Sequence, residues 1–316
     1  MSNLIFPPFV EKGDKVIILS PSGKIEPDFI AGAKKRLNSW GLRVQVGRHA
    51  RGSFASYAGT IRHRVADLQQ ALDDDEAKVI LCSRGGYGAV HLMDKLDFGR
   101  FERHPKWLVG FSDITALHCY LQQQGFASIH GPMAKHLTLE PEDDPSTLKL
   151  KDLLFGKAFA SRKLYSYTCN GHPLNHPGKA EGILRGGNLS VYYGLRGTRY
   201  DIPAPGTILF LEDVGERPHS VERMMYNLKL GGVLEQLSGL IIGQFTEYED
   251  HGNLGKQLMG AIADIVREYR FPVCFDFSTG HIRDNYPLIE GAHVRLRVTK
   301  KEAKLTFDKP LPTATV

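Results

Sequence analysis

Short apolar runs alternate with helix-forming stretches through the first 130 residues of the sequence. The runs that predict buried strands are 16–19, 42–46, 79–82, 107–109 and 127–130. Between them, apolar residues recur every three or four positions, as over 61–72, which predicts amphipathic helices. This alternation favours a doubly wound, largely parallel sheet, in which ligand sites form where the strands end.

A second alternating block begins near residue 179. It predicts strands over 181–184, 207–211, 240–242 and 273–275, helices over 221–228 and 254–265, and a closing hairpin over 293–298 and 303–307. The stretch between the blocks is acidic, punctuated by proline and rich in turn-forming residues. We therefore expect an N-terminal α/β domain over 1–140, a linker over 141–178 and a C-terminal α/β domain over 179–316.

Composition narrows the class of protein. The chain has 316 residues, of which 42% are hydrophobic and 24% charged, and these fractions exclude disordered, collagen-like and disulfide-scaffold proteins. The net charge of +5 is spread along the chain, so nucleic acid is not expected as a partner. The sequence begins without a signal peptide and has no apolar run of membrane-spanning length, so we expect a cytoplasmic protein without a membrane partner. The four cysteines form no C-x-x-C pair and are expected to be reduced.

One strand end carries a candidate nucleophile. The run 107–109 leads directly into Gly110-Phe111-Ser112-Asp113, and a helix is predicted to follow at once. A sharp strand-to-helix turn of this kind exposes a serine hydroxyl, and the helix N-terminus favours developing negative charge. Ile114 departs from the G-x-S-x-G pattern, which requires glycine there. Ser112 or Asp113 could instead serve only as a helix cap, which is the commoner role of such residues.

A glycine-rich loop follows the neighbouring predicted strand, at Ser83-Arg84-Gly85-Gly86. Glycines at a strand end allow backbone N–H groups to approach a ligand closely. One such N–H, together with that of Asp113, could bind an oxyanion. A phosphate-binding loop is the rival interpretation, although no Walker lysine or G-x-G-x-x-G pattern accompanies the glycines.

A serine nucleophile requires a base and an acid that orients the base. His281 follows the strand predicted over 273–275, and Glu212 follows the strand predicted over 207–211. Each residue alone is more often a loop or capping residue than a catalytic one. The chain order Ser112, Glu212, His281 is that of α/β-hydrolases, which strengthens the joint hypothesis.

The sequence predicts neither a metal nor a cofactor. His172 and His176 are four residues apart, but they lie in a loop rich in proline and glycine and lack the glutamate of H-E-x-x-H.

Five motifs together resemble those of the LD-carboxypeptidase family of serine peptidases, and the resemblance extends from about residue 13 to residue 307. The motifs are Ser83-Arg84-Gly85-Gly86-Tyr87-Gly88, Gly110-Phe111-Ser112-Asp113, Leu184-Arg185-Gly186-Gly187-Asn188, Leu211-Glu212-Asp213 and Gly280-His281.

The resemblance implies a flavodoxin-like N-terminal domain with a parallel sheet, and a C-terminal α/β domain with its own sheet. It also implies a homodimer and a site at the domain interface. The implied triad is Ser112, Glu212 and His281. The implied oxyanion hole uses the N–H of Asp113 and of Gly86 or Gly85.

The implied activity releases terminal D-Ala from cytoplasmic murein tetrapeptides or UDP-linked muropeptides, by cutting the amide that D-Ala forms with an L-centre diamino acid. The small basic surplus would attract such anionic substrates. Arg84 is the candidate for binding the terminal carboxylate, because its guanidinium matches a carboxylate geometrically, and Asn188 is a second candidate for substrate binding.

Three alternatives remain. The family also contains microcin C self-immunity hydrolases, which cleave aminoacyl-nucleotide conjugates; the regular Arg-Gly-Gly-Tyr-Gly loop favours the peptidase branch, while Tyr165 and Tyr167 leave base stacking open. A non-catalytic module that binds a peptide or nucleotide would use the same glycine loop. A nucleotide kinase would require an acidic residue beside the glycines, where Arg84 and Tyr87 stand instead.

Overall fold

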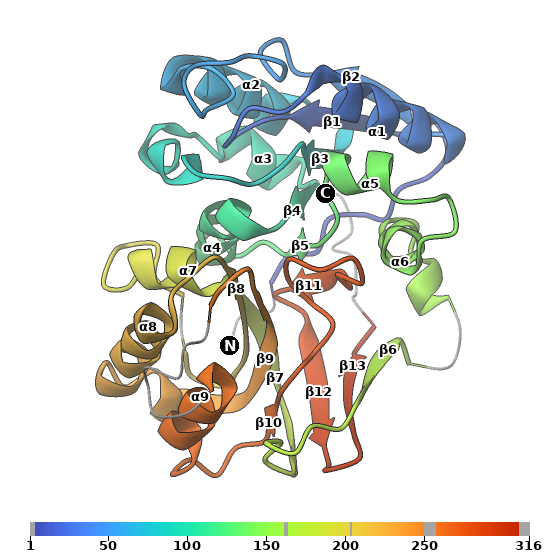
Figure 1. Cartoon of the computed structure of the whole chain (residues 1–316). Helices are drawn as coiled ribbons and strands as arrows, with labels where there is room; N and C mark the ends of the chain where they lie inside the picture. Colours follow the sequence, from blue (N-terminus) through green and yellow to red (C-terminus); the bar gives the residue numbers. More distant parts are fainter. Residues whose placement is uncertain (1–3, 161–163, 203, 250–256, 310–316) are drawn as a thin grey trace. The chain divides into compact units, whose positions relative to one another are not determined.

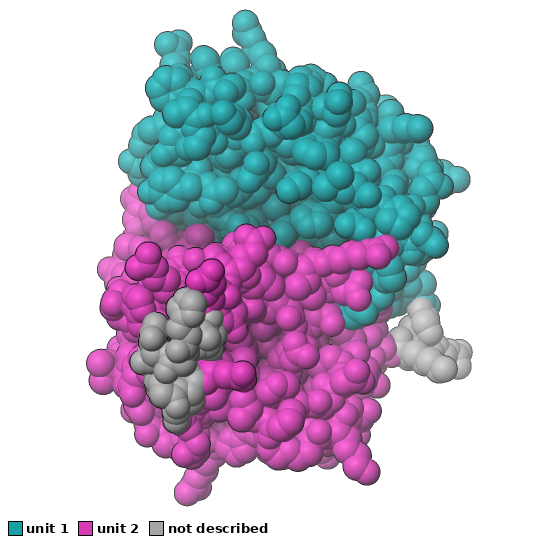
Figure 2. Space-filling view, viewed as in Figure 1, with its two compact units in different colours: residues 1–162, 286–289, 310–316 teal, residues 163–285, 290–309 magenta. Residues whose placement is uncertain are grey.

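The computed structural model describes residues 4–160, 164–202, 204–249 and 257–309. The chain divides into two compact units, each with a sheet of its own (Figures 1 and 2). Unit 1 takes residues 1–162, 286–289 and 310–316, and unit 2 takes residues 163–285 and 290–309.

The sheet of unit 1 has the strand order β11-β5-β4-β3-β1-β2. Its strands are β1 (Lys15–Leu19), β2 (Arg43–Val46), β3 (Ala77–Cys82), β4 (Trp107–Gly110), β5 (Ser128–His130) and β11 (Leu288–Glu290). The pairs that join β1 to β5 are all parallel. The order of those five strands is that of flavodoxin-like folds, which confirms the predicted fold of the N-terminal part. β11 was not predicted.

Amphipathic helices connect the strands of unit 1 (Figure 1). They are α1 (Pro27–Ser39), α2 (Ile61–Asp73), α3 (Gly99–Arg103), α4 (Thr115–Gln123), α5 (Ala134–Leu139) and α6 (Pro145–Leu154). In α2, the hydroxyl of Thr60 accepts a hydrogen bond from the N–H of His63 and caps the helix, while Leu68 and Leu72 are buried. Helical spacing of apolar residues therefore predicted this element accurately.

The sheet of unit 2 is mixed, with the order β10-β9-β8-β7-β12-β13-β6. Its strands are β6 (Ser166–Asn170), β7 (Gly178–Asn188), β8 (Thr207–Val214), β9 (Leu237–Thr246), β10 (Val273–Cys274), β12 (His293–Val298) and β13 (Glu302–Phe307). The pairs from β7 to β10 are parallel, and those from β7 through β12 and β13 to β6 are antiparallel. The β12–β13 hairpin confirms the prediction: β12 has the predicted bounds, and β13 begins one residue earlier than predicted, at Glu302.

Three helices of unit 2 are α7 (Leu189–Gly194), α8 (Pro218–Leu230) and α9 (Leu258–Val266), and α8 packs against both of the others (Figure 1). Part of the helix predicted over 254–265 lies outside the described residues. The range 141–178, expected to be a linker, contains α6 in unit 1 and β6 at an edge of the unit 2 sheet. In the part of the chain described here, no helix is both long and apolar enough to span a membrane.

Candidate active site

In unit 1, Ser112 lies in the tight turn between β4 and α4. Its φ is +64°, a left-handed backbone conformation that costs a non-glycine residue roughly 1–3 kcal/mol. The residue is partly exposed, whereas its neighbours Phe111 and Asp113 are buried. A strained serine on a strand-to-helix turn has the geometry that presents a hydroxyl for attack.

Gly85 lies against this serine, because β3 and β4 are adjacent parallel strands. A Cβ built on Gly85 would lie 2.8 Å from Cβ and 2.9 Å from Oγ of Ser112, closer than real Cβ atoms approach. Gly86 has φ +117° and its backbone is exposed. The structure thus brings together Ser112 and the glycine loop, as their positions at neighbouring strand ends predicted.

The side chain of Asp113 holds this loop in place. Its Oδ2 accepts hydrogen bonds from Oγ of Ser22 (2.6 Å) and from the N–H of Ala89 (2.8 Å). Burial raises the pKa of Asp113, although these two hydrogen bonds and the charge of Arg64 oppose the rise. The buried Arg64 guanidinium donates to the carbonyl oxygen of Gly88 (2.8 Å) at the end of the loop.

His118 holds the turn in place through a hydrogen bond to Gly110. This role was not predicted, because the sequence contains 13 histidines and His118 is not distinctive among them. Its Nε2 donates to the carbonyl oxygen of Gly110 (2.9 Å), and its Nδ1 accepts from the hydroxyl of Ser128 (2.8 Å). Burial lowers the pKa of His118 to about 4, so the ring is neutral and both contacts persist at neutral pH. The position of His118 on α4, six residues past Ser112, was the available signal.

Arg84 is partly exposed, and its Nη1 donates to the carbonyl oxygen of Lys24 at 3.3 Å. This long hydrogen bond leaves the other guanidinium donors able to bind a ligand.

In unit 2, His281 and Glu212 form a hydrogen-bonded pair. Nδ1 of His281 lies 2.8 Å from Oε2 of Glu212, whose side chain has 0% exposure against 20% for His281. Burial works to lower the pKa of His281, but the hydrogen bond and charge of Glu212, with Asp213 and Glu247, outweigh it, and the pKa is raised. Such a pair can fix the imidazole tautomer and stabilise an imidazolium.

The loop that carries His281 is tied to β9 by backbone hydrogen bonds. The N–H of Phe277 donates to Ile242 and the N–H of Gln244 donates to Thr279. Gly280 has φ +123°, and a Cβ there would lie 2.9 Å from Oε2 of Glu212. Glycine is therefore required before His281 both for the backbone conformation and for the close contact.

Asn188 and Asp213 hold the strand ends beside Glu212. Nδ2 of Asn188 donates to Oδ1 of Asp213 (2.9 Å), and Oδ1 of Asn188 accepts from the N–H of Val191 and caps α7. Burial raises the pKa of Asp213 to about 6, with the charge of Glu212 adding to the rise. The side chain of Asn188 thus has structural partners at the position where substrate binding was expected.

The remaining candidates, His172, Tyr165 and Tyr167, also lie in unit 2. The ring of His172 stacks on Phe275, and among the described residues no group of three or more His, Cys, Asp or Glu side chains could hold a metal ion. Tyr167 is 3% exposed and packs edge-on against Phe277 and Phe307, while Tyr165 is partly exposed.

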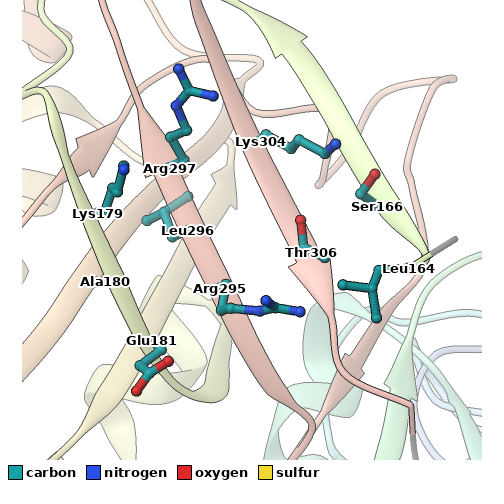
Figure 3. A pocket seen from close by; sticks show the side chains of 10 residues that line it. All are labelled: Leu164, Ser166, Lys179, Ala180, Glu181, Arg295, Leu296, Arg297, Lys304 and Thr306. Atoms are coloured by element: carbon teal, nitrogen blue, oxygen red, sulfur yellow. The ribbon is translucent and has the colours of Figure 1, made fainter.

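A basic cavity of about 750 Å³ lies on the antiparallel part of the unit 2 sheet (Figure 3). Four cations line it, with Glu181 as the acidic residue: Lys179, Arg295, Arg297 and Lys304. Arg295 pairs with Asp308 at 2.9 Å. Because neither Glu212 nor His281 lines this cavity, it is not part of the candidate active site.

Family models for the two halves of the fold match the chain. The model of the LD-carboxypeptidase N-terminal domain matches residues 16–131, and that of the C-terminal domain matches residues 181–296. The chain belongs to the LD-carboxypeptidase family.

Similar proteins fall into two groups. The murein tetrapeptide carboxypeptidase of Pseudomonas aeruginosa is 34% identical over 281 residues, which cover 86% of this chain and 89% of that protein. The crystal structure of muramoyltetrapeptide carboxypeptidase from Oxalobacter formigenes has a TM-score of 0.82 at 26% identity, and the match covers 94% and 100% of the two chains. The microcin C7 self immunity protein MccF has a TM-score of 0.85 at 20% identity, covering 98% and 100% of the two chains, and is similar in fold.

Proposed function

We propose that this protein is a serine-type LD-carboxypeptidase that releases terminal D-Ala from murein tetrapeptides. The bond cut is the amide between D-Ala and the L-centre of meso-diaminopimelate or lysine. Membership of the family supports carboxypeptidase activity, and the name of the Pseudomonas aeruginosa relative supports the substrate class. The observation that carries the proposal is the hydrogen bond between His281 and the fully buried Glu212.

The proposed chemistry uses Ser112 as nucleophile and His281 as base. With Nδ1 held by Glu212, Nε2 of His281 accepts the Ser112 proton as Oγ attacks the carbonyl carbon. His281 then protonates the amine of the leaving D-Ala. Water hydrolyses the acyl-enzyme in the same way and frees the tripeptide. This reaction requires Oγ of Ser112 and Nε2 of His281 to come within hydrogen-bonding distance in the working enzyme.

The negative charge that develops on the carbonyl oxygen needs two donors. The N–H of Asp113 follows the nucleophile, and the N–H of Gly86 belongs to the loop that lies against Ser112. Within the part of the chain that the structure describes, the N–H of Gly86 has no hydrogen-bond partner, so it is available to an oxyanion. Gly85 allows the loop to lie close to Ser112 and does not itself donate to the oxyanion. Removal of one such donor typically costs on the order of 10²–10³ in turnover.

An exopeptidase must also recognise the terminal carboxylate. We assign this role to Arg84, because its guanidinium is partly exposed and weakly engaged next to the glycine loop. In line with the family resemblance, we further propose a cytoplasmic homodimer that acts on free or UDP-linked muropeptides. Its catalytic domains are 1–140 and 179–316, and 141–178 connects them.

The competing function is hydrolysis of an aminoacyl-nucleotide conjugate, since the microcin self immunity protein has a similar fold. Burial of Tyr167 against Phe277 and Phe307 leaves that ring unable to stack on a base. Tyr165 is the remaining aromatic candidate of the pair.

The deciding experiment incubates the protein separately with murein tetrapeptide and with an aminoacyl-sulfamoyl adenosine, and measures product masses. We expect free D-Ala and tripeptide from the first substrate, and neither product from a folded Ser112→Ala variant. Cleavage of the second substrate alone would replace the proposal by its competitor. Saturable binding of the tetrapeptide without turnover would instead indicate a binding module.

A further inference from the structure

Two cysteines that are 105 residues apart in sequence lie together in unit 2. Sγ of Cys169 on β6 is 3.8 Å from Sγ of Cys274 on β10. These strands stand at opposite ends of the sheet order, so the contact is not one between adjacent strands. The cysteines were expected to be separate reduced thiols, and both are free in this structure.

Hydrogen bonds on both sides of Cys274 hold the two edges together. Val273 exchanges two backbone hydrogen bonds with His176, at 3.0 and 3.1 Å. The N–H of Phe275 donates to Oδ1 of Asn175 at 2.8 Å. The segment that follows β6 is therefore fixed to β10 immediately before and after the buried thiol.

The same segment is fixed to the β12–β13 turn. The N–H of Gly171 donates to the carbonyl oxygen of Lys301 (2.8 Å), and Nδ2 of Asn175 donates to that of Thr299 (3.0 Å). A disulfide bond is about 2.05 Å long, so the two sulfur atoms need to approach by roughly 1.8 Å, a distance within reach of side-chain rotation. The backbone around the pair is thus organised before any bond forms.

The two thiols differ in exposure and in acidity. Cys169 is partly exposed, whereas Cys274 is completely buried. The hydrogen bond with Cys274 lowers the pKa of Cys169 against the opposing effect of burial, and the same hydrogen bond together with burial raises the pKa of Cys274. An oxidant arriving from solvent therefore meets the thiol with more thiolate character first.

We propose that Cys169 and Cys274 form an oxidisable dithiol whose co-reactant is a hydroperoxide, and that the resulting disulfide joins the two edges of the unit 2 sheet. The Cys169 thiolate attacks the peroxide, so that an S–O bond forms, the O–O bond breaks and one water leaves. The Cys274 thiol then loses its proton and attacks the sulfenic sulfur of Cys169. The S–S bond forms as the S–O bond breaks and a second water leaves, so two thiols and one hydrogen peroxide give one disulfide and two waters.

The test uses the full chain, reduced, desalted and treated with hydrogen peroxide. Thiols are counted in denaturant, and proteolytic peptides are weighed without reduction. We expect the loss of two of the four thiols and one cross-linked peptide pair containing Cys169 and Cys274. The melting temperature should rise by roughly 5 °C or more and return after reduction, because the bond closes a long loop in the unfolded chain.

Two variants make the result specific. Cys169→Ser, a conservative change at a partly exposed position, should abolish the cross-link and the rise in melting temperature. The double variant Cys82→Ser with Cys119→Ser, which alters the two thiols of unit 1, should retain both effects. Retention of four thiols overturns the proposal. So does oxidation of Cys169 to sulfinic acid without a cross-link, or a Cys169 disulfide between two chains. None of these readouts depends on carboxypeptidase activity.

Discussion

Nδ1 of His281 lies 2.8 Å from Oε2 of Glu212, and Gly280 makes this distance possible because a Cβ there would lie 2.9 Å from the same oxygen. A buried carboxylate in this position determines which imidazole nitrogen carries the proton. Two distant parts of the chain therefore serve one hydrogen bond: β8, which carries Glu212, and the loop in which His281 follows a glycine with positive φ.

Glu212→Gln should abolish most turnover while the fold is retained. The amide can occupy the same space but cannot stabilise the imidazolium, and we expect kcat to fall on the order of 10³–10⁴. The measurement is D-Ala release from murein tetrapeptide, with Glu235→Gln, an exposed change in the same unit, as control. A kcat within tenfold of the unmodified enzyme would contradict the assigned role of Glu212.

The pH dependence of kcat/KM should show the raised pKa of His281. The base must be neutral to accept a proton, so activity should increase with pH through a pKa above the ordinary value of 6.5. Glu212→Gln should move this midpoint downward, because burial, which lowers the pKa of His281, then acts without the opposing charge of Glu212. The His281–Glu212 ion pair should make its full contribution to the free energy of unfolding below pH 6.5. That contribution should disappear as pH rises through the folded-state pKa of His281. A midpoint below 6.5 in the unmodified enzyme would exclude this account.

Gly85→Ala should reduce activity by displacing the nucleophile. The added Cβ would lie 2.8 Å from Cβ of Ser112, so one of the two must move, at a cost of about 1–3 kcal/mol in stability. Gly194→Ala is the matched control, since a Cβ there meets no atom within 4 Å. Kinetics and thermal melting of both variants provide the check, and equal behaviour of the two would contradict the proposed contact.

Ser112→Gly and Ser112→Ala should both be inactive, but they should differ in stability. Glycine relieves the left-handed strain that alanine retains, and this gain exceeds the entropy that glycine loses on folding. We expect the glycine variant to be more stable than the alanine variant by about 1 kcal/mol in denaturant unfolding. The reverse order would show that the turn is not strained at this residue.

Treatment with a chelator should leave D-Ala release unchanged, because the proposed mechanism uses a serine nucleophile and no metal. The measurement compares turnover before and after dialysis against EDTA. Inactivation that zinc or magnesium reverses would contradict the serine mechanism and direct attention to histidines such as His172 and His176.

Local periodicity explains which parts of the fold could be predicted. Apolar and polar residues alternate along 293–298 and 303–307, a pattern that predicts two strands with one buried and one exposed face. The structure confirms this hairpin. The flavodoxin-like order of β1 to β5 follows from strands that alternate with helices. β11 has three residues and no helix before it, so its pairing with β5 carries no local signal.

The candidate site was predictable where chemistry coincides with strand ends. Ser112 and Gly85 follow buried strands, and Glu212 lies two residues before the end of β8, which continues to Val214, so their positions were apparent from hydrophobic runs. The left-handed conformation of Ser112, the support that His118 gives to Gly110 and the contact between Cys169 and Cys274 depend on tertiary packing. Spacing in a single sequence does not encode these relationships.

β11 also affects how the protein can be made. Residues 288–290 complete a sheet whose other strands end at residue 130, so the N-terminal unit is synthesised long before its last strand emerges from the ribosome. Until then the β5 edge is open to pairing with other chains, which is a known route to misassembly. A fragment that stops at residue 162 keeps that open edge permanently. Expression of the two halves as separate polypeptides should therefore yield an aggregating first half, however well its remaining core is packed.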